Sequence, residues 1–242
     1  MVRRFATWLS GFDPQTEVPP RGLIEARHRR TKPHIFTDQE IQQLMAEAST
    51  LSSSKGLRAL TYGTLIGLLA ATGLRPGEAL ALDMSDVDLQ NGVLAIRQTK
   101  FGKSRFVPVE ESTRAALAHY AQRRDELCPR RGTEAFLVSE RGTRLEPSTA
   151  RRTFARLSCH IGLRTAREGR RSGRGPRLMD FRHTFATWRL VEWYRAGLNV
   201  ERQMPTLATY LGHVSVGHTY WYIEAVPELL QLATEYLSAR QR

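Results

Sequence analysis

Only one stretch of this sequence alternates apolar and polar residues in the way that half-buried β-strands do. It runs from residue 87 to residue 109, VDLQNGVLAIRQTKFGKSRFVPV, with a turn at Asn91-Gly92 and a second turn near residues 101–103. The pattern predicts a small three-stranded antiparallel sheet. Other apolar residues from position 37 onward recur at helical spacing. The expected fold class is therefore α+β and mainly α, with packed helices and one small antiparallel β-sheet.

Capping and turn residues mark several helix starts. Thr37 and Glu40 form a capping box, and Pro76 occupies a first-turn position that proline tolerates. Helical periodicity predicts further helices at residues 57–72, 111–127, 147–161, 178–196, 204–211 and 227–237. We therefore expect residues 36–242 to form one domain.

The first 35 residues differ in character from the rest of the chain. A short apolar face that includes Phe5 and Leu9 predicts a helix without a capping residue, as though an earlier part of it were missing. Several prolines and a basic cluster that includes Arg29 and Arg30 then predict an extended linker. This linker could lie along phosphates, and a merely solvated linker is the alternative.

The formal net charge of +12 and the pI near 10.5 favour a polyanionic partner, because lysine and arginine release condensed counterions when they bind phosphates. Nucleic acid is the first partner to consider. A membrane is less favoured, since the most apolar run, residues 60–73, contains glycines and is too short to span a bilayer. Cys128 and Cys159 lack the spacing of a zinc site, and no secretory signal is present. We expect a cytoplasmic protein that needs no metal or other cofactor.

Two segments place basic side chains at a helix start and at a hairpin. In TGLRPGEAL, Arg75 precedes a helix from which Glu78 can orient or neutralise its guanidinium group. In TKFGKSRFVPV, three cations surround the expected hairpin tip, namely Lys100, Lys103 and Arg105. Taken alone, the first segment is more often a capping arrangement, and the second is more often a solvated hairpin.

Two further segments combine apolar and reactive side chains. In RLMDFRHTFATWRL, Arg182 lies in an apolar helix, where a guanidinium group needs a carboxylate or phosphate partner, and Asp180 could be that partner. In YLGHVSVGHTYWYIEAV, His213 ends a helix and Tyr222 belongs to an aromatic cluster. Aromatic clusters are more often core than catalytic, and a lone histidine is more often structural.

In order and spacing, these four segments resemble the motifs of the tyrosine recombinases, also called the phage integrase family, over residues 35–240. The family's catalytic residues fall on Arg75, Lys100, Arg182, His213 and Tyr222, with Glu78 as the acid that supports the first arginine. Five motif positions in the correct order are far more specific than any one motif.

The resemblance implies a site-specific recombinase or integrase of a bacterial mobile element that acts on double-stranded DNA. Tyr222 would attack a phosphodiester and form a 3′-phosphotyrosyl link, while Arg75 and Arg182 bind the phosphate. His213 would add a hydrogen bond, and Lys100 would protonate the departing 5′-oxygen. A second 5′-hydroxyl could reseal the strand without ATP or metal, because the covalent link stores the energy of the broken bond.

The sequence departs from the family pattern in two places. Met179 stands where the family generally has a histidine that assists proton transfer, and a thioether is only a weak acceptor. We therefore expect slow cleavage. The second departure is length, because family members commonly carry an N-terminal domain that clamps DNA. Residues 1–35 match only a remnant of its last helix and a linker.

Other segments suggest further contacts. A basic, glycine-containing loop carries Arg170, Arg171 and Arg174, which we expect to contact the DNA backbone, with a solvated loop as the alternative. In the family, the last helix often docks on a neighbouring protomer, which implies a multimer, a tetramer on DNA. Such a protein would associate with the nucleoid.

Two rival functions remain open at this stage. The first is a DNA-binding regulator or decoy subunit that kept the fold and lost catalysis through Met179 and the missing clamp domain. The second is a DNA-relaxing topoisomerase, which the LGH spacing makes less favoured.

Overall fold

The computed structural model describes residues 2–20, 32–97, 104–165, 175–217, 219 and 220, together with Tyr222, Leu229 and Gln231. The chain separates into two compact units, Met1–Lys32 and Pro33–Arg242. In the first unit, α1 spans Val2–Leu9, and the Arg3 side chain donates a hydrogen bond to the Pro19 carbonyl (2.8 Å). The origin of this unit in a DNA-clamping domain stays a prediction, and Arg29 and Arg30 lie outside the described residues.

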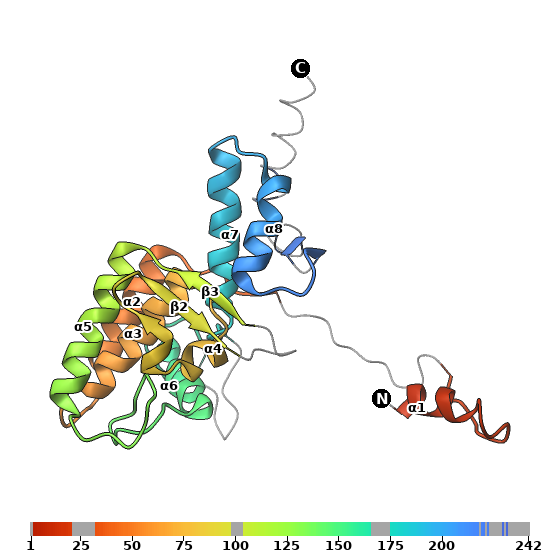
Figure 1. Cartoon of the computed structure of the whole chain (residues 1–242), viewed down its shortest axis with the longest axis horizontal. Helices are drawn as coiled ribbons and strands as arrows, with labels where there is room; N and C mark the ends of the chain where they lie inside the picture. The colour runs from red at the N-terminus through yellow and green to blue at the C-terminus, as the bar shows by residue number, and fades with distance from the viewer. Residues whose placement is uncertain are drawn as a thin grey trace. The chain divides into compact units, whose positions relative to one another are not determined.

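The second unit confirms the expected α+β, mainly α class (Figure 1). Its first helices are α2 (Asp38–Ser49), α3 (Leu57–Thr72) and α4 (Pro76–Ala81), followed by the 3₁₀ helix η1 (Met84–Asp86). Its strands are β1 (Val87–Asp88), β2 (Val93–Ile96) and β3 (Arg105–Pro108). Its remaining described helices are α5 (Glu111–Leu127), α6 (Pro147–His160), α7 (Asp180–Arg195) and α8 (Val200–Leu211).

The small sheet has the strand order β1-β2-β3, and both pairs are antiparallel. Gly92 adopts a positive φ of 65° in the β1–β2 turn, a conformation that glycine reaches without a Cβ penalty. In the β2–β3 pair, Leu94 lies opposite Val107, and both side chains are buried. The predicted turn near residues 101–103 lies outside the described residues.

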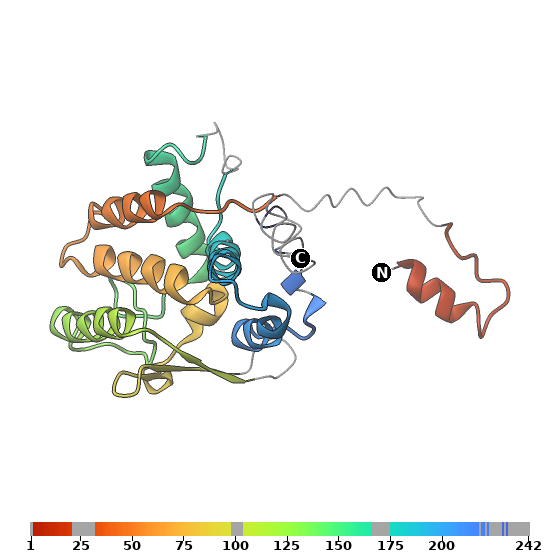
Figure 2. The same cartoon turned by 90° about the horizontal axis from the view of Figure 1, so that it is seen from above.

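The main hydrophobic core forms around α3, which packs beside α2 and α5 (Figure 2). The predicted capping box is present at the start of α2, where Thr37 and Glu40 each bond the other's backbone N–H. Helix α3 ends at Gly73, whose left-handed backbone (φ 60°) allows the chain to turn into α4. Gly73 and the start of α4 thus lie together at one end of the main core.

A second, smaller apolar cluster combines α7, α8 and Tyr222. Helix α8 begins at Val200, four residues before the predicted start, so that prediction was wrong. In the structure the side chain of Asn199 caps the helix by accepting from the Arg202 N–H, and Pro205 lies inside it. The helix ends at Leu211, as predicted, with Gly212 as its C-cap residue.

Candidate active site

Arg75 is held from its own helix, as the sequence predicted. Its Nη1 donates to Oε1 of Glu78 (2.7 Å), and its backbone N–H donates to Oε2 of the same carboxylate (3.1 Å). The Glu78 side chain is only 8% exposed, whereas the Arg75 side chain is 34% exposed. Glu78 therefore fixes one side of a guanidinium group that still reaches solvent.

Arg105, at the first residue of β3, binds the same carboxylate. Its Nη2 lies 2.8 Å from Oε2 of Glu78 and its Nη1 lies 3.2 Å from Oε1, while its side chain is 11% exposed. Burial would raise the pKa of Glu78, but the hydrogen bonds and charge of Arg105, followed by those of Arg75, outweigh it and lower the pKa. Arg105 was predicted as a DNA contact, and the structure places it behind Arg75 in an ion-pair cluster.

Arg182 is buried at 3% exposure near the start of α7. Asp180 is not its partner, contrary to the expectation, because the Asp180 carboxylate binds Arg177. Arg182 instead donates to the Gly73 carbonyl (3.0 Å) and to the Leu211 carbonyl (2.6 Å). Within the described part of the chain no carboxylate forms an ion pair with Arg182.

Burial lowers the pKa of Arg182 to about 10, with nearby Tyr222 and Glu78 raising it and Arg75 lowering it. The group therefore remains a cation at neutral pH. A buried cation that is bound to carbonyl groups leaves room for an anionic partner, because isolated buried charge is costly. A DNA phosphate would supply the missing negative charge.

The C-terminal end of α8 gathers the three guanidinium groups. Three consecutive carbonyl oxygens each accept from one arginine, Tyr210 from Arg105 (2.8 Å), Leu211 from Arg182 (2.6 Å) and Gly212 from Arg75 (3.2 Å). The last carbonyls of a helix have no partner inside the helix and carry its partial negative charge, so cations bind there favourably. Arginines that are far apart in sequence thereby meet at a single point.

His213 and Tyr222 lie beside this arginine cluster. Nδ1 of His213 lies 2.7 Å from Oγ1 of Thr219, and its ring stacks on that of Tyr222 with the centroids 5.9 Å apart. Tyr222 is 3% exposed and packs in the second apolar cluster, yet its side chain hydrogen-bonds with Arg182. The ring is therefore buried while the hydroxyl group reaches the cationic cluster.

His183 is a neighbour that the sequence analysis left without a role. Its ring meets the Tyr222 ring edge-on, with the centroids 5.5 Å apart. Burial lowers the pKa of His183, so its imidazole is neutral at neutral pH. In the sequence, only its position next to Arg182 pointed to a role in the site. Its contact with Tyr222 joins two segments that are far apart in the sequence, so no local pattern reveals it.

The other predicted residues fall into two groups. Met179 is the N-cap residue of α7, three positions before Arg182, and is 37% exposed. The remaining predicted residues lie outside the described residues, namely Lys100, Lys103, Arg170, Arg171 and Arg174. Their roles stay predictions.

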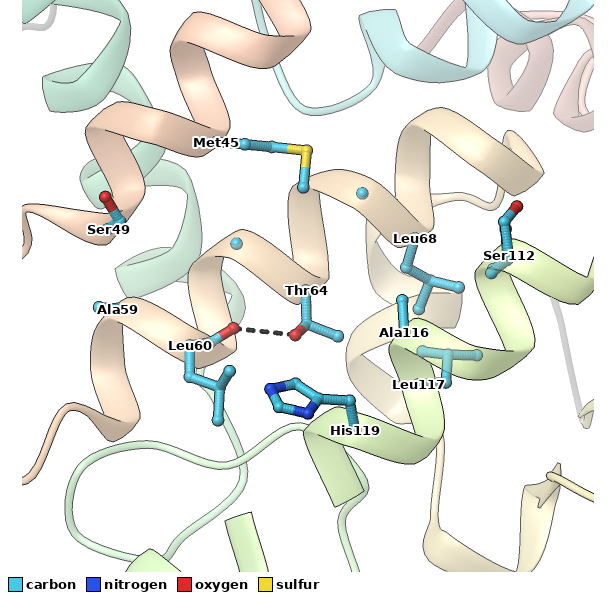
Figure 3. A pocket seen from close by; sticks show the side chains of 13 residues that line it. Met45, Ser49, Ala59, Leu60, Thr64, Leu68, Ser112, Ala116, Leu117 and His119 are labelled. Carbon is cyan, nitrogen blue, oxygen red and sulfur yellow. Dashed lines mark hydrogen bonds between the residues drawn. The ribbon is translucent and has the colours of Figure 1, made fainter. Parts of the chain in front are cut away.

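The described cavities do not contain the arginine cluster. A cavity of about 530 Å³ lies between α2, α3 and α5, with Met45, Leu60 and His119 among its lining residues (Figure 3). A second one, of about 410 Å³, lies between β3, α7 and α8 and includes Arg189 and Tyr210. The candidate site is defined here by its convergent cations.

Metal sites and membrane-spanning helices can be judged for the described residues only. Among them, no group of three or more histidine, cysteine, aspartate or glutamate side chains could hold a metal ion. In the same part of the chain, no helix is long and apolar enough to cross a membrane.

Residues 34–228 match the Phage integrase family. The integrase/recombinase y4rB of Sinorhizobium fredii is 44% identical over 99% of this chain and 76% of its own length. The tyrosine recombinase XerD of Caulobacter vibrioides is 28% identical over 95% of this chain and 70% of its own length.

Solved structures agree with this assignment. The XerA recombinase is 28% identical with a TM-score of 0.62, covering 88% of this chain and 67% of that one. The Tn1549 transposon integrase, bound to transposon right end DNA, has a TM-score of 0.65 at 16% identity, covering 98% of this chain and 78% of that one. At 16% identity, the likeness to the transposon integrase shows only that the fold is shared. Because the family match covers most of the sequence and a relative is 44% identical over nearly all of it, this chain belongs to the phage integrase family of tyrosine recombinases.

Proposed function

We propose that this chain is a site-specific DNA recombinase that cleaves and rejoins double-stranded DNA through Tyr222. The observation that supports this most directly is the meeting of Arg75, Arg182 and the Tyr222 hydroxyl group at the end of α8. The relationship to named integrases and recombinases, and to a transposon integrase, favours a substrate at the ends of a mobile element.

The arginines bind the phosphate that is to be cleaved. Attack on a phosphodiester passes through a state with extra negative charge on the non-bridging oxygens, which guanidinium groups match in geometry and charge. Arg182 is buried as a cation without an ion-paired carboxylate in the described residues, so its charge is available for this state. Arg75, which still reaches solvent, binds the same phosphate from the open side.

Tyr222 is the nucleophile in this proposal. The phosphorus–oxygen bond to Tyr222 forms as the bond to the 5′-oxygen breaks, and Lys100 gives that oxygen its proton. The neighbouring Arg182 cation stabilises negative charge on the phenol oxygen as attack proceeds. Because Tyr222 and Arg182 are each 3% exposed, entry of the DNA phosphate must open their surroundings.

Assembly and location follow from the same reaction. Recombination exchanges strands between two duplexes, each cut in both strands, which requires four nucleophiles and so four copies of this chain. We propose that the segment predicted as a helix at residues 227–237 joins neighbouring copies in this tetramer. Such an enzyme works where bacterial DNA lies, in the cytoplasm at the nucleoid.

A covalent-capture experiment tests the proposal. Nicked duplexes with randomised sequence around the nick would be incubated with the protein, so that a short cleaved fragment diffuses away and traps the adduct. Denaturing gels would then isolate protein bound covalently to DNA, and sequencing would give the preferred site. We expect adducts from the native chain at a restricted set of sequences and none from Tyr222→Phe.

Each alternative gives a different result. Sequence-selective binding without any adduct would indicate a DNA-binding regulator and overturn the proposal. Adducts that form at unrelated sequences, together with relaxation of plasmids that lack the preferred site, would indicate a topoisomerase. An adduct that survives Tyr222→Phe would assign the nucleophile to another residue.

A further inference from the structure

We propose that Arg105 is a positioning residue for catalysis, which takes up part of the Glu78 charge and so leaves Arg75 free to bind the phosphate. This inference rests on the proposed function. It replaces the expectation that Arg105 contacts the DNA backbone.

The contacts of Arg105 are internal. Its guanidinium group makes one hydrogen bond to each Glu78 oxygen and a third, from Nε, to the Tyr210 carbonyl (2.8 Å). With its side chain 11% exposed, Arg105 offers little surface to DNA. Arg182 is more buried still, but the charge of Arg105, unlike that of Arg182, is already paired with the Glu78 carboxylate.

Arg105 and Arg75 share one carboxylate. Each Glu78 oxygen accepts one hydrogen bond from Arg105 and one from Arg75, where the donors are the Arg75 side chain and its backbone N–H. Without Arg105, Glu78 would be free to bind the Arg75 guanidinium group with both oxygens. A bidentate carboxylate would compete with the phosphate for the same nitrogens and neutralise the same charge.

Arg105 also adds to the charge of the cluster. Arg75, Arg105 and Arg182 contribute three positive charges against the single negative charge of Glu78. Removal of Arg105 would leave two positive charges against one negative. The cluster would then hold less positive charge when negative charge builds up on the phosphate.

The backbone at the end of α8 is shaped around Arg105. A Cβ atom on Gly212 would lie 2.7 Å from Nη1 of Arg105, and Gly212 has a φ of +68°. Because Gly212 also gives its carbonyl to Arg75, Arg105 sits against the residue that orients the catalytic arginine. One side chain of β3 thus connects α4 with the end of α8.

Measurements of single-turnover cleavage and of DNA binding distinguish a positioning role of Arg105 from a direct contact with a DNA phosphate. The substrate would be the nicked duplex recovered by covalent capture, at saturating protein. We expect Arg105→Gln to slow cleavage about 100-fold, as a displaced catalytic group does, with DNA affinity and its salt dependence unchanged. A phosphate contact would give a different result. The slope of the logarithm of the DNA-binding constant against the logarithm of salt concentration would fall in magnitude by about 0.9, while cleavage at saturating protein stayed normal, and the inference would be overturned.

Arg97→Gln is the matched control. Arg97 follows β2 on the same hairpin and also pairs with a largely buried carboxylate, Asp86, but its side chain is 61% exposed. We expect this variant to cleave at the native rate. An equal slowing in both variants would mean that any charge lost from the hairpin slows cleavage, and the specific role of Arg105 would be rejected.

A double-variant cycle tests the mechanism. If Arg105 acts by sharing the Glu78 charge, then Arg105→Gln should slow cleavage only about twofold in a Glu78→Gln background, because coupled residues are not additive. Effects that multiply in the double variant would overturn the inference. Should Arg105→Gln fail to fold, Arg105→Lys supplies the same cycle, with a loss of about 10-fold expected because an ammonium group cannot form the two-pronged contact.

The proposed function and the role of Arg105 fail in different ways. A native chain that forms no adduct with any DNA overturns the function. If the native chain forms the adduct but the effects of Arg105→Gln and Glu78→Gln on the cleavage rate multiply, only the role of Arg105 is rejected.

Discussion

Arg124 near the end of α5 and Arg182 near the start of α7 are equally buried, each at 3% exposure, but their surroundings differ. Arg124 forms an ion pair with Asp125 (2.8 Å), donates to the Phe136 carbonyl (2.9 Å) and lies over the Phe136 ring. Arg182 binds two carbonyl groups and a tyrosine hydroxyl group, with a second arginine nearby.

The difference separates structural from functional burial of charge. Arg124 has a carboxylate, a carbonyl and an aromatic face, so the fold itself satisfies its charge. Arg182 has hydrogen-bond acceptors but no ion-paired carboxylate in the described residues, so its charge is satisfied only when an anion arrives. A buried arginine therefore indicates a site only when its charge is left unbalanced.

The largest expected effect comes from Arg182→Met. Cleavage should fall about 10³-fold, as it does when one donor to a developing oxyanion is lost. The free energy of unfolding should change by less than about 1 kcal/mol, because relief of a buried cation offsets the lost carbonyl contacts. Urea unfolding and single-turnover cleavage measure the two. A large loss of stability would mean that Arg182 is structural, like Arg124.

Gly73→Ala should displace Arg182 without touching it. A Cβ on Gly73 would lie 2.7 Å from Cδ1 of Phe185, so either the Phe185 side chain or the backbone that carries the accepting carbonyl must shift. We expect cleavage to fall about 100-fold. Gly56→Ala is the control, because Gly56 precedes the same helix with a φ of +79° and nothing within 4 Å. Cleavage at the native rate in Gly73→Ala would show that the position of this carbonyl is unimportant.

Arg124→Met should lower stability and leave the cleavage rate unchanged, whereas Arg182→Met should lower the cleavage rate and leave stability nearly unchanged. We expect it to lower the free energy of unfolding by about 1–3 kcal/mol, since it removes charged hydrogen bonds. Cleavage by the folded fraction should stay at the native rate. Thermal unfolding in parallel with the adduct assay measures both. Slower cleavage by fully folded protein would break the comparison between the two arginines.

Met179→His should restore the histidine that the resemblance to the family leads us to expect at this position. We expect cleavage about 10-fold faster, less than the ~10²–10⁴ of a fully placed acid–base group. Leu198→His, at another exposed apolar position, should have no effect on the rate. Equal rates for Met179→His and the native chain would show that the methionine does not limit the reaction.

The smallest effect concerns pH. The folded-state pKa of Glu78 is lowered, so its contribution to stability is present above its unfolded pKa of about 4.3 and is lost as pH falls through the lower folded value. The native chain should therefore lose stability below about pH 4.3 faster than Glu78→Gln. Urea unfolding across this range measures the difference. If the free energy of unfolding falls with pH equally in the native chain and in Glu78→Gln, then Glu78 is not held as an anion by Arg75 and Arg105.

Much of the fold could be predicted from local sequence. The helix at residues 57–72, the capping box at Thr37 and the Asn91-Gly92 turn all lie where the pattern placed them. Each of these depends on residues that are close in the sequence. The pairing of Arg75 with Glu78 is equally local, because residues three apart share one helix face.

The errors concern contacts between distant segments. Asp180 was nearest to Arg182 in sequence, but the helix geometry gives its carboxylate to Arg177. Arg105 looked like a surface cation because its hairpin is basic, and its partner Glu78 lies 27 positions away. Periodicity cannot reveal such pairs. The three carbonyls at the end of α8 carry no sequence signal at all, since every residue has one.

The place of these carbonyls in the chain has a consequence for biosynthesis. The backbone that unites the arginines, residues 210–212, leaves the ribosome after all three of them, and Tyr222 follows later still. A nascent chain thus exposes its cations to DNA while it has no means of breaking a strand. Cleavage by Tyr222, the proposed nucleophile, can therefore begin only after translation has passed residue 222.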